Sequence, residues 1–245
     1  MTRNASQNFV NHIALVLDAS GSMSRHQSQL VKVVDEQIAY LAQRSKELDQ
    51  ETRVTVYTFD DTAKCVIYDK DVLRLPSIAS LYRLGGMTAL IDATLLSQDD
   101  LALQPEKYGD HSYLTMVLTD GLENASGGHT YKTPAMHTAL AEKLSSRLAA
   151  LPDHWTVAVL VPDQMAKREA MSFGFPKDNI AIWDTTSQHG AEEAVSVIRT
   201  ATDSYMTGRA SGIRGTKTLF VGDQVDAKAV KAKLIPLAHT AYELV

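Results

Sequence analysis

The stretch His12–Ser24, HIALVLDASGSMS, joins a short apolar run to a loop of small polar residues. A run of this length with branched side chains, closed by a Gly/Ser turn, is typical of a strand buried on both faces of a sheet. Helical spacing follows, so the loop connects a strand to a helix. Because open α/β sheets bind ligands beyond the carboxyl ends of their parallel strands, we expect this loop to carry the functional site.

Three oxygen-bearing side chains occupy alternate positions in this loop: Asp18, Ser20 and Ser22. A carboxylate and two hydroxyl groups can converge on one hard cation, and Mg²⁺ prefers oxygen ligands in octahedral geometry. A structural interpretation is equally open, because Asp and Ser also cap helices and Gly makes turns. The loop by itself does not decide between a metal site and a helix cap.

Two distant segments favour the metal site. Leu84–Leu90, LGGMTAL, places Thr88 after a glycine pair at the start of a helix. The apolar run Leu114–Thr119 ends in Asp120, in the same way that the first run ends in Asp18. With these segments the chain resembles the von Willebrand factor type A (VWA) domain of the prokaryotic or phage type, over about residues 10–205.

This resemblance implies a metal-ion-dependent adhesion site. In the family, a D-x-S-x-S loop, a distant Thr and a distant Asp form that site, and the matching residues here are Asp18, Ser20, Ser22, Thr88 and Asp120. The two serines would ligate the metal directly, whereas Thr88 and Asp120 would alternate between direct and water-mediated contact. The expected cofactor is Mg²⁺, with Mn²⁺ or Ca²⁺ as alternatives.

The resemblance also implies a function, which is binding rather than catalysis. An open metal position would accept a Glu or Asp carboxylate from a partner protein, so the chain would be a non-enzymatic interaction module or adaptor. The partner could belong to an ATPase-linked or multi-protein assembly. Met23, Ser24, Glu123 and Asn124 follow the two Asp loops and are candidates for the partner surface, although polar residues are ordinary in loops.

Composition bounds the class of protein. The 245 residues suit one large domain, or one domain with an appendage. A net charge of −5 argues against nucleic acid or an anionic membrane as partner. The single cysteine, Cys65, cannot form an internal disulfide. With neither a transmembrane stretch nor a signal-peptide pattern, we expect a cytoplasmic location.

The pattern of apolar residues predicts an α/β fold of the doubly wound, Rossmann-like type. We expect a mostly parallel six-stranded sheet with one short antiparallel edge strand, residues 63–68, and helices on both faces. The expected strands are residues 12–17, 51–59, 63–68, 112–119, 155–161 and 180–183. The expected helices are residues 24–48, 89–103, 134–151, 164–173 and 192–206.

The predicted domain organisation has three parts. Residues 1–9 form a lead-in, residues 10–207 form the VWA domain, and residues 208–245 form a basic appendage or the start of a further module. Within the last part, residues 217–221 read as a short strand and residues 225–237 as a helix that carries three lysines.

Two other functions compete with the binding module. A Mg²⁺-dependent phosphotransferase or hydrolase of the haloacid-dehalogenase type also opens with an apolar strand ending in Asp. Its loop carries a second Asp as general acid/base two residues later, where this chain has Ser20. The sequence also lacks the P-loop, G-x-S-x-G and H-E-x-x-H motifs. The other alternative, an assembly protein that does not use the metal, is disfavoured because all five ligand types are intact.

Overall fold

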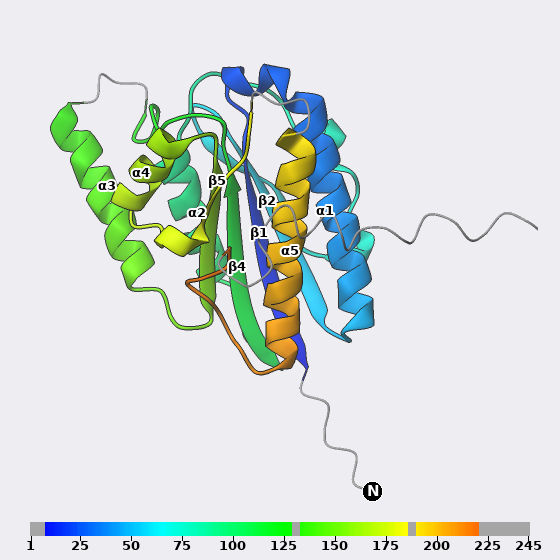
Figure 1. Cartoon of the computed structure of the whole chain (residues 1–245). Coiled ribbons are helices and arrows are strands. Elements are labelled where there is room, and N and C mark those ends of the chain that lie inside the picture. Colours follow the sequence, from blue (N-terminus) through cyan, green and yellow to red (C-terminus); the bar gives the residue numbers. More distant parts are fainter. Residues whose placement is uncertain (1–7, 129–132, 186–189, 221–245) are drawn as a thin grey trace, which may run out of the picture.

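The computed structural model describes residues 8–128, 133–185 and 190–220. Its strands are β1 (Phe9–Asp18), β2 (Glu51–Phe59), β3 (Ala63–Asp71), β4 (Asp110–Leu118), β5 (Trp155–Val161) and β6 (Ile180–Ile182). They form one six-stranded sheet in the order β3-β2-β1-β4-β5-β6 (Figure 1). All neighbouring pairs are parallel except β2 with β3, so the predicted fold class is confirmed. The antiparallel edge strand extends to Asp71, which is longer than predicted.

Helices cover both faces of the sheet. They are α1 (Gln27–Glu47), α2 (Leu90–Ala102), α3 (Pro134–Ala149), α4 (Gln164–Ser172) and α5 (Gly190–Ala210). Figure 1 shows α1 and α5 on the face toward the viewer, with α2, α3 and α4 packed from the other side. None of the helices in the described ranges is long and apolar enough to cross a membrane.

The central strand β1 separates two hydrophobic cores. Ile13, Leu15 and Leu17 pack with the α1–α5 layer, whereas Ala14 and Val16 pack with the opposite layer. Side chains alternate between faces along a strand, so an uninterrupted apolar run serves both layers at once. With β2 and β4 on either side, the end of β1 is fixed, and Asp18 emerges at the carboxyl edge of the sheet.

The first and last helices differ from their predicted ranges. The chain after β1 forms a 3-10 turn, Gly21–Arg25, before α1 begins at Gln27 rather than at residue 24. The last helix, α5, runs to Ala210, four residues beyond the predicted end at 206. The predicted helical turn after Pro76 is present as the 3-10 turn Ile78–Ser80.

The segment after α5 corrects one prediction. Residues 217–220 form turns instead of a strand, because their hydrogen bonds go to loop groups: Phe220 N–H donates to the carbonyl of Asp178 at 3.0 Å. Leu219 and Phe220 are buried in the core beneath α5. Residues 208–220 therefore lie against the domain. Residues 1–7, 129–132, 186–189 and 221–245, including the predicted helix 225–237, lie outside the described residues, and the boundary at 208 stays a prediction.

A buried arginine fastens the end of α5 to the sheet. Arg209 has no exposed surface, and its Nε–H donates to Asn11 Oδ1 at 3.2 Å. Its guanidinium also donates to the carbonyl of Asp110, lies 3.5 Å from that carboxylate and stacks over Phe9. Arg214 binds the same carboxylate at 2.9 Å, but its side chain is 47% exposed. Two arginines thus share one acid from different environments.

We expect these arginines to differ in their contribution to stability. Arg209→Ala should lower the free energy of unfolding by about 3 kcal/mol, because it leaves buried acceptors without a partner. Arg214→Ala should lower it by less than about 1 kcal/mol, because water screens an exposed pair. Urea denaturation of both variants measures the difference. Equal losses would contradict the assignment of Arg209 as the anchor.

Candidate metal centre

Four of the five predicted ligands are linked by hydrogen bonds at the carboxyl edge of the sheet. Asp18 Oδ1 accepts the backbone N–H of Ser20 at 2.8 Å. The hydroxyl oxygens of Ser20 and Ser22 are 3.0 Å apart, and Ser22 donates to Asp120 Oδ1 at 2.7 Å. The loop after β1 and the loop after β4 therefore bring their oxygens together, as adjacent parallel strands require.

A glycine turn brings the fifth residue, Thr88, to the same place. Gly85 N–H donates to the carbonyl of Ala19 at 2.7 Å, and Gly21 N–H donates to that of Gly86 at 2.9 Å. A Cβ built on Gly121 would lie 3.6 Å from Thr88 Oγ1 and 4.0 Å from Ser22 Oγ. Both hydroxyls thus border the residue that follows Asp120.

The electrostatics of the cluster fit a hard cation. Asp18 has no exposed surface, and burial raises the pKa of its carboxyl to about 6. Hydrogen bonds from Ser20 and Thr119 oppose that rise, and the negative charge of Asp120 adds to it. Bound positive charge would favour both ionised carboxylates. The donors are two carboxylates and three hydroxyls, a set that suits Mg²⁺, Mn²⁺ or Ca²⁺ better than a soft metal.

The candidate centre depends on its hydroxyl groups. In the described part of the chain, no group of three or more His, Cys, Asp and Glu side chains could hold a metal ion. Asp18 and Asp120 supply only two carboxylates, so Ser20, Ser22 and Thr88 complete the set. A search restricted to strong metal ligands would therefore miss this site.

Thr119 is a supporting residue that the sequence did not single out. Its hydroxyl donates to Asp18 Oδ2 at 2.6 Å and accepts the N–H of Gly121 at 3.1 Å. Its carbonyl accepts the indole N–H of Trp183 at 3.0 Å. The phenol of Tyr82 also donates to the backbone carbonyl of Asp18. The only sequence signal for Thr119 is its place directly before Asp120.

Two of the residues proposed for a partner surface have internal roles instead. Met23 has no exposed surface and packs in the core against the α1 side. Glu123 is 7% exposed, and its carboxylate accepts the N–H groups of Ile91, Ala125 and Ser126. Glu123 thereby satisfies the free N–H groups at the start of α2 and in its own loop. Buried side chains of this kind cannot form the contact surface expected of them.

Asn124 and Ser24 are exposed, as a partner surface requires. Asn124 also positions Thr88, because its Oδ1 accepts the Thr88 N–H at 2.8 Å while its own N–H donates to the Thr88 carbonyl at 3.0 Å. Met87, which the sequence did not single out, is 41% exposed beside Thr88. The surface around the candidate ligands is thus partly apolar.

Comparisons with known proteins identify the fold. No protein-family model and no curated protein matches the chain. A solved structure named von Willebrand factor type A, from Catenulispora acidiphila, aligns with 78% of this chain at a TM-score of 0.52 and 14% identity. This chain has the VWA fold. At such identity the likeness extends to the fold alone.

Two further solved structures share the VWA fold with this chain. The PilB minor pilin from Streptococcus sanguinis aligns with 86% of it, with a TM-score of 0.60 and 13% identity. Proximal thread matrix protein 1 from the mussel byssus aligns with 78%, with a TM-score of 0.53 and 16% identity. The chain spans 42% of the C. acidiphila protein, 64% of the pilin and 46% of the byssus protein.

The glycine turn of this VWA domain gives a sharp test of the site geometry. A Cβ on Gly85 would lie 1.8 Å from Asp60 Oδ2 and 2.6 Å from Asp60 Cβ. Gly85→Ala should therefore displace the turn together with Thr88 and lower divalent-cation affinity about tenfold or more. Gly21→Ala is the matched control, because its nearest contact would be 3.5 Å. Equal Mn²⁺ affinities by calorimetry would contradict the placement of Thr88.

We also expect Thr119 to act on the metal through Asp18. Thr119→Val keeps the shape but removes the donor to Asp18 Oδ2, so Mn²⁺ affinity should fall about 10- to 100-fold. Thr119→Ser restores the hydroxyl and should restore most of the affinity. Calorimetric titration of both variants measures the effect. A valine variant that binds like the wild type would remove Thr119 from the site.

Proposed function

We propose that this chain is a divalent-cation-dependent protein-interaction module. One observation carries the proposal: five oxygen-bearing side chains from three loops meet at the carboxyl edge of the sheet, with four of them in one hydrogen-bonded chain. The residues that would hold Mg²⁺ are Asp18, Ser20, Ser22, Thr88 and Asp120. Bound Mg²⁺ would supply an electrophilic position to which an anionic oxygen from another molecule can coordinate.

Charge supports a carboxylate as the captured group. Ser20, Ser22 and Thr88 are neutral ligands, so only Asp18 and Asp120 offset the charge of a dication. Where water lies between an Asp and the metal, that compensation is weaker, and a Glu or Asp side chain from a partner becomes a favourable further ligand. Asp18 is buried and hydrogen-bonded on both oxygens, so it remains fixed while a ligand binds or leaves.

The surface beside the cluster supports a protein as the partner. Ser22, Ser24 and Asn124 are exposed, and Met87 offers an apolar side chain next to them. A partner acid followed by an apolar residue would match this combination of metal and thioether. Two similar solved structures are named as a minor pilin and as the pilus adhesin SpaC from Lactobacillus rhamnosus GG, names that fit an adhesive role better than a catalytic one.

The chain would act without catalysis. The phosphotransferase alternative needs a second carboxylate where this loop has Ser20, which is 2% exposed and hydrogen-bonded to Ser22. A serine held in this way cannot replace a carboxylic acid as proton donor. The cytoplasmic location, the ATPase-linked assembly and the exclusion of nucleic acid and membrane partners stay predictions from the sequence.

Metal binding is the first test. Calorimetric titration of Mg²⁺ and Mn²⁺ into the metal-stripped chain should show one site, and Asp18→Ala should abolish it, since the most central anionic ligand is lost. Asp99→Ala serves as control, because Asp99 pairs with Arg147 on the surface. Circular dichroism checks that each variant stays folded. A wild type that binds neither metal would contradict the proposal.

Partner chemistry is tested in a second titration. A short Glu-containing peptide should bind the chain in the presence of Mg²⁺ and lose that binding when a chelator is added. The same peptide with Gln in place of Glu is the matched control and should not bind. Binding that ignores the chelator, or that ignores the change from Glu to Gln, would contradict capture of a carboxylate.

A further inference from the structure

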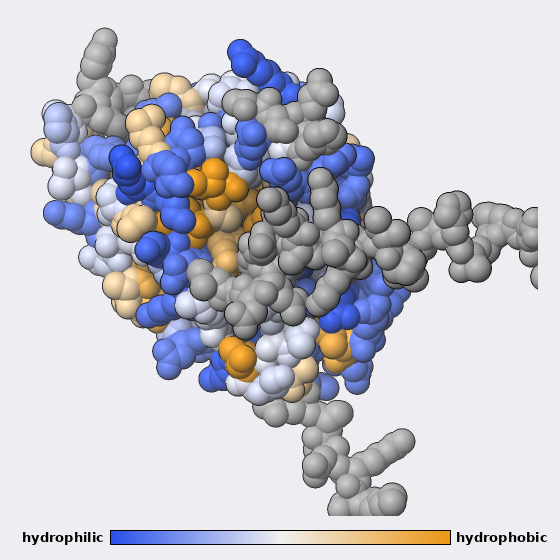
Figure 2. Space-filling view, in the orientation of Figure 1, coloured by the Kyte–Doolittle hydropathy of each residue, from blue (hydrophilic) through white to orange (hydrophobic). Residues whose placement is uncertain are grey.

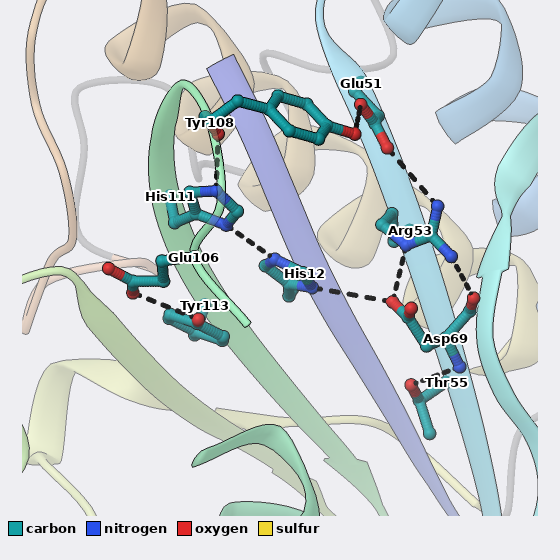
Figure 3. Close-up of polar contacts among 9 residues, drawn as sticks. All are labelled: His12, Glu51, Arg53, Thr55, Asp69, Glu106, Tyr108, His111 and Tyr113. Atoms are coloured by element: carbon teal, nitrogen blue, oxygen red, sulfur yellow. Dashed lines mark hydrogen bonds and ion pairs between the residues drawn. The ribbon is translucent and has the colours of Figure 1, made fainter. Parts of the chain in front are cut away.

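A continuous polar chain lies near the amino end of β1, away from the metal centre (Figure 3). His12 Nε2 lies 2.9 Å from His111 Nδ1, and His111 Nε2 lies 2.6 Å from the backbone carbonyl of Tyr108. On the other side of its ring, His12 Nδ1 lies 3.7 Å from Asp69 Oδ1. The chain therefore links β4, β1 and the edge strand β3. Both imidazoles are buried, with 3% and 5% of their surface exposed.

The contacts fix which nitrogen of each ring carries the proton. The carbonyl of Tyr108 can only accept, so His111 must carry its proton on Nε2. Neutral His111 then presents a bare Nδ1, so His12 must donate from Nε2. His12 Nδ1 is left without a proton and faces Asp69, a second acceptor. This nitrogen is the one position in the chain where an additional proton can be received directly.

Charged and aromatic groups from every neighbouring element surround His12. From β2, Arg53 donates to Asp69 Oδ1 at 2.6 Å and to Glu51 at 3.3 Å. From the loop before β4, the Tyr108 hydroxyl donates to the other oxygen of Glu51, and Glu106 accepts from Tyr113. The ring of Tyr113 stacks on His12 with centroids 4.8 Å apart. Asp69 is thus the acid that His12 and Arg53 share.

We propose that His12 is an acid-sensitive latch on the edge strand β3. A proton on Nδ1 of His12 converts two opposed acceptors into an ion pair with Asp69. That pair competes with Arg53 for the same oxygen, Oδ1. Protonation of one buried histidine therefore loosens the contact through which β2 holds the end of β3.

The end of β3 depends on that contact. Asp69 has a φ of 42°, a left-handed conformation that non-glycine residues adopt at a cost. Arg53 holds it there from two sides, through the carboxylate and through the backbone carbonyl. The pairing of β2 with β3 also shifts register around Val56, next to this contact. A strained residue at an irregular edge is where a weakened ion pair has most effect.

The direction of the effect follows from burial. Removal of water lowers the pKa of His12 to about 4, with Asp69 and Glu51 opposing and His111 and Arg53 adding to the decrease. Neutral His12 therefore stabilises the fold above about pH 6.5, the ordinary value for histidine. As the pH falls from about 6.5 toward 4, the unfolded chain binds one more proton. The unfolding equilibrium constant should then rise up to about tenfold per pH unit on this account.

Nuclear magnetic resonance on the ¹⁵N-labelled full chain tests the latch without any variant. At neutral pH, His12 and His111 should both carry the proton on Nε2. On acidification, His12 should gain a proton at Nδ1 with a midpoint below about 6.5, and the Arg53 Nε–H signal should shift with the same midpoint. Amide exchange at residues 68–71 should quicken in step. A proton on Nδ1 at neutral pH, a midpoint at or above that of free histidine, or an unmoved Arg53 signal would overturn the proposal.

A variant pair isolates the contribution of His12. Gln at position 12 can still donate to His111 but cannot gain a proton, so His12→Gln should flatten the pH dependence of unfolding between pH 6.5 and 4. His137→Gln, on α3 against Phe173, should leave that dependence unchanged. Urea denaturation across this pH range measures both variants. The same slope in His12→Gln as in the wild type would overturn the assignment.

Discussion

The buried carboxylate of Asp18 is the constraint on which the rest of the candidate site depends. An isolated ionised group in a protein interior is costly unless hydrogen bonds or an opposite charge stabilise it. The fold supplies the hydrogen bonds from two directions: Ser20 N–H binds one oxygen, and the Thr119 hydroxyl binds the other. The opposite charge is what a divalent cation would add. The need to satisfy one carboxylate thus explains both the loop conformation and the proposed cofactor.

The outer loops stabilise the site by backbone contacts. Gly85 and Gly86 approach the first loop as closely as they do because neither carries a Cβ. Glu123 and Asn124 hold the start of α2 and Thr88 through backbone N–H groups. Main-chain hydrogen bonds fix positions more firmly than flexible side chains can. The result is an arrangement in which Thr88 is positioned before any metal or partner binds.

The sequence predicted the sheet and the proposed ligands because both leave local patterns. An apolar run that ends in D-x-S-x-S identifies a buried strand and its loop, and the same logic located Asp120. The supporting residues left no such pattern, because each acts across a long sequence distance: Thr119 reaches Asp18 over 101 residues, and Tyr82 reaches it over 64. Met23 and Glu123 were misassigned for the same reason, since loop position does not reveal burial. Leu219 and Phe220 lack the periodicity that would mark them as core.

Burial of one strand shifts its two titratable groups in opposite directions, and the neighbours of each group determine the consequence. Burial favours the neutral form of both, so it raises the pKa of Asp18 to about 6 and lowers that of His12 to about 4. Asp18 lies beside a second carboxylate and three hydroxyls, so a cation can restore its charge. Near His12, Arg53 already binds Asp69, so added positive charge competes instead of compensating. A metal centre is therefore plausible chemistry at one end of β1, and a proton-sensitive contact at the other.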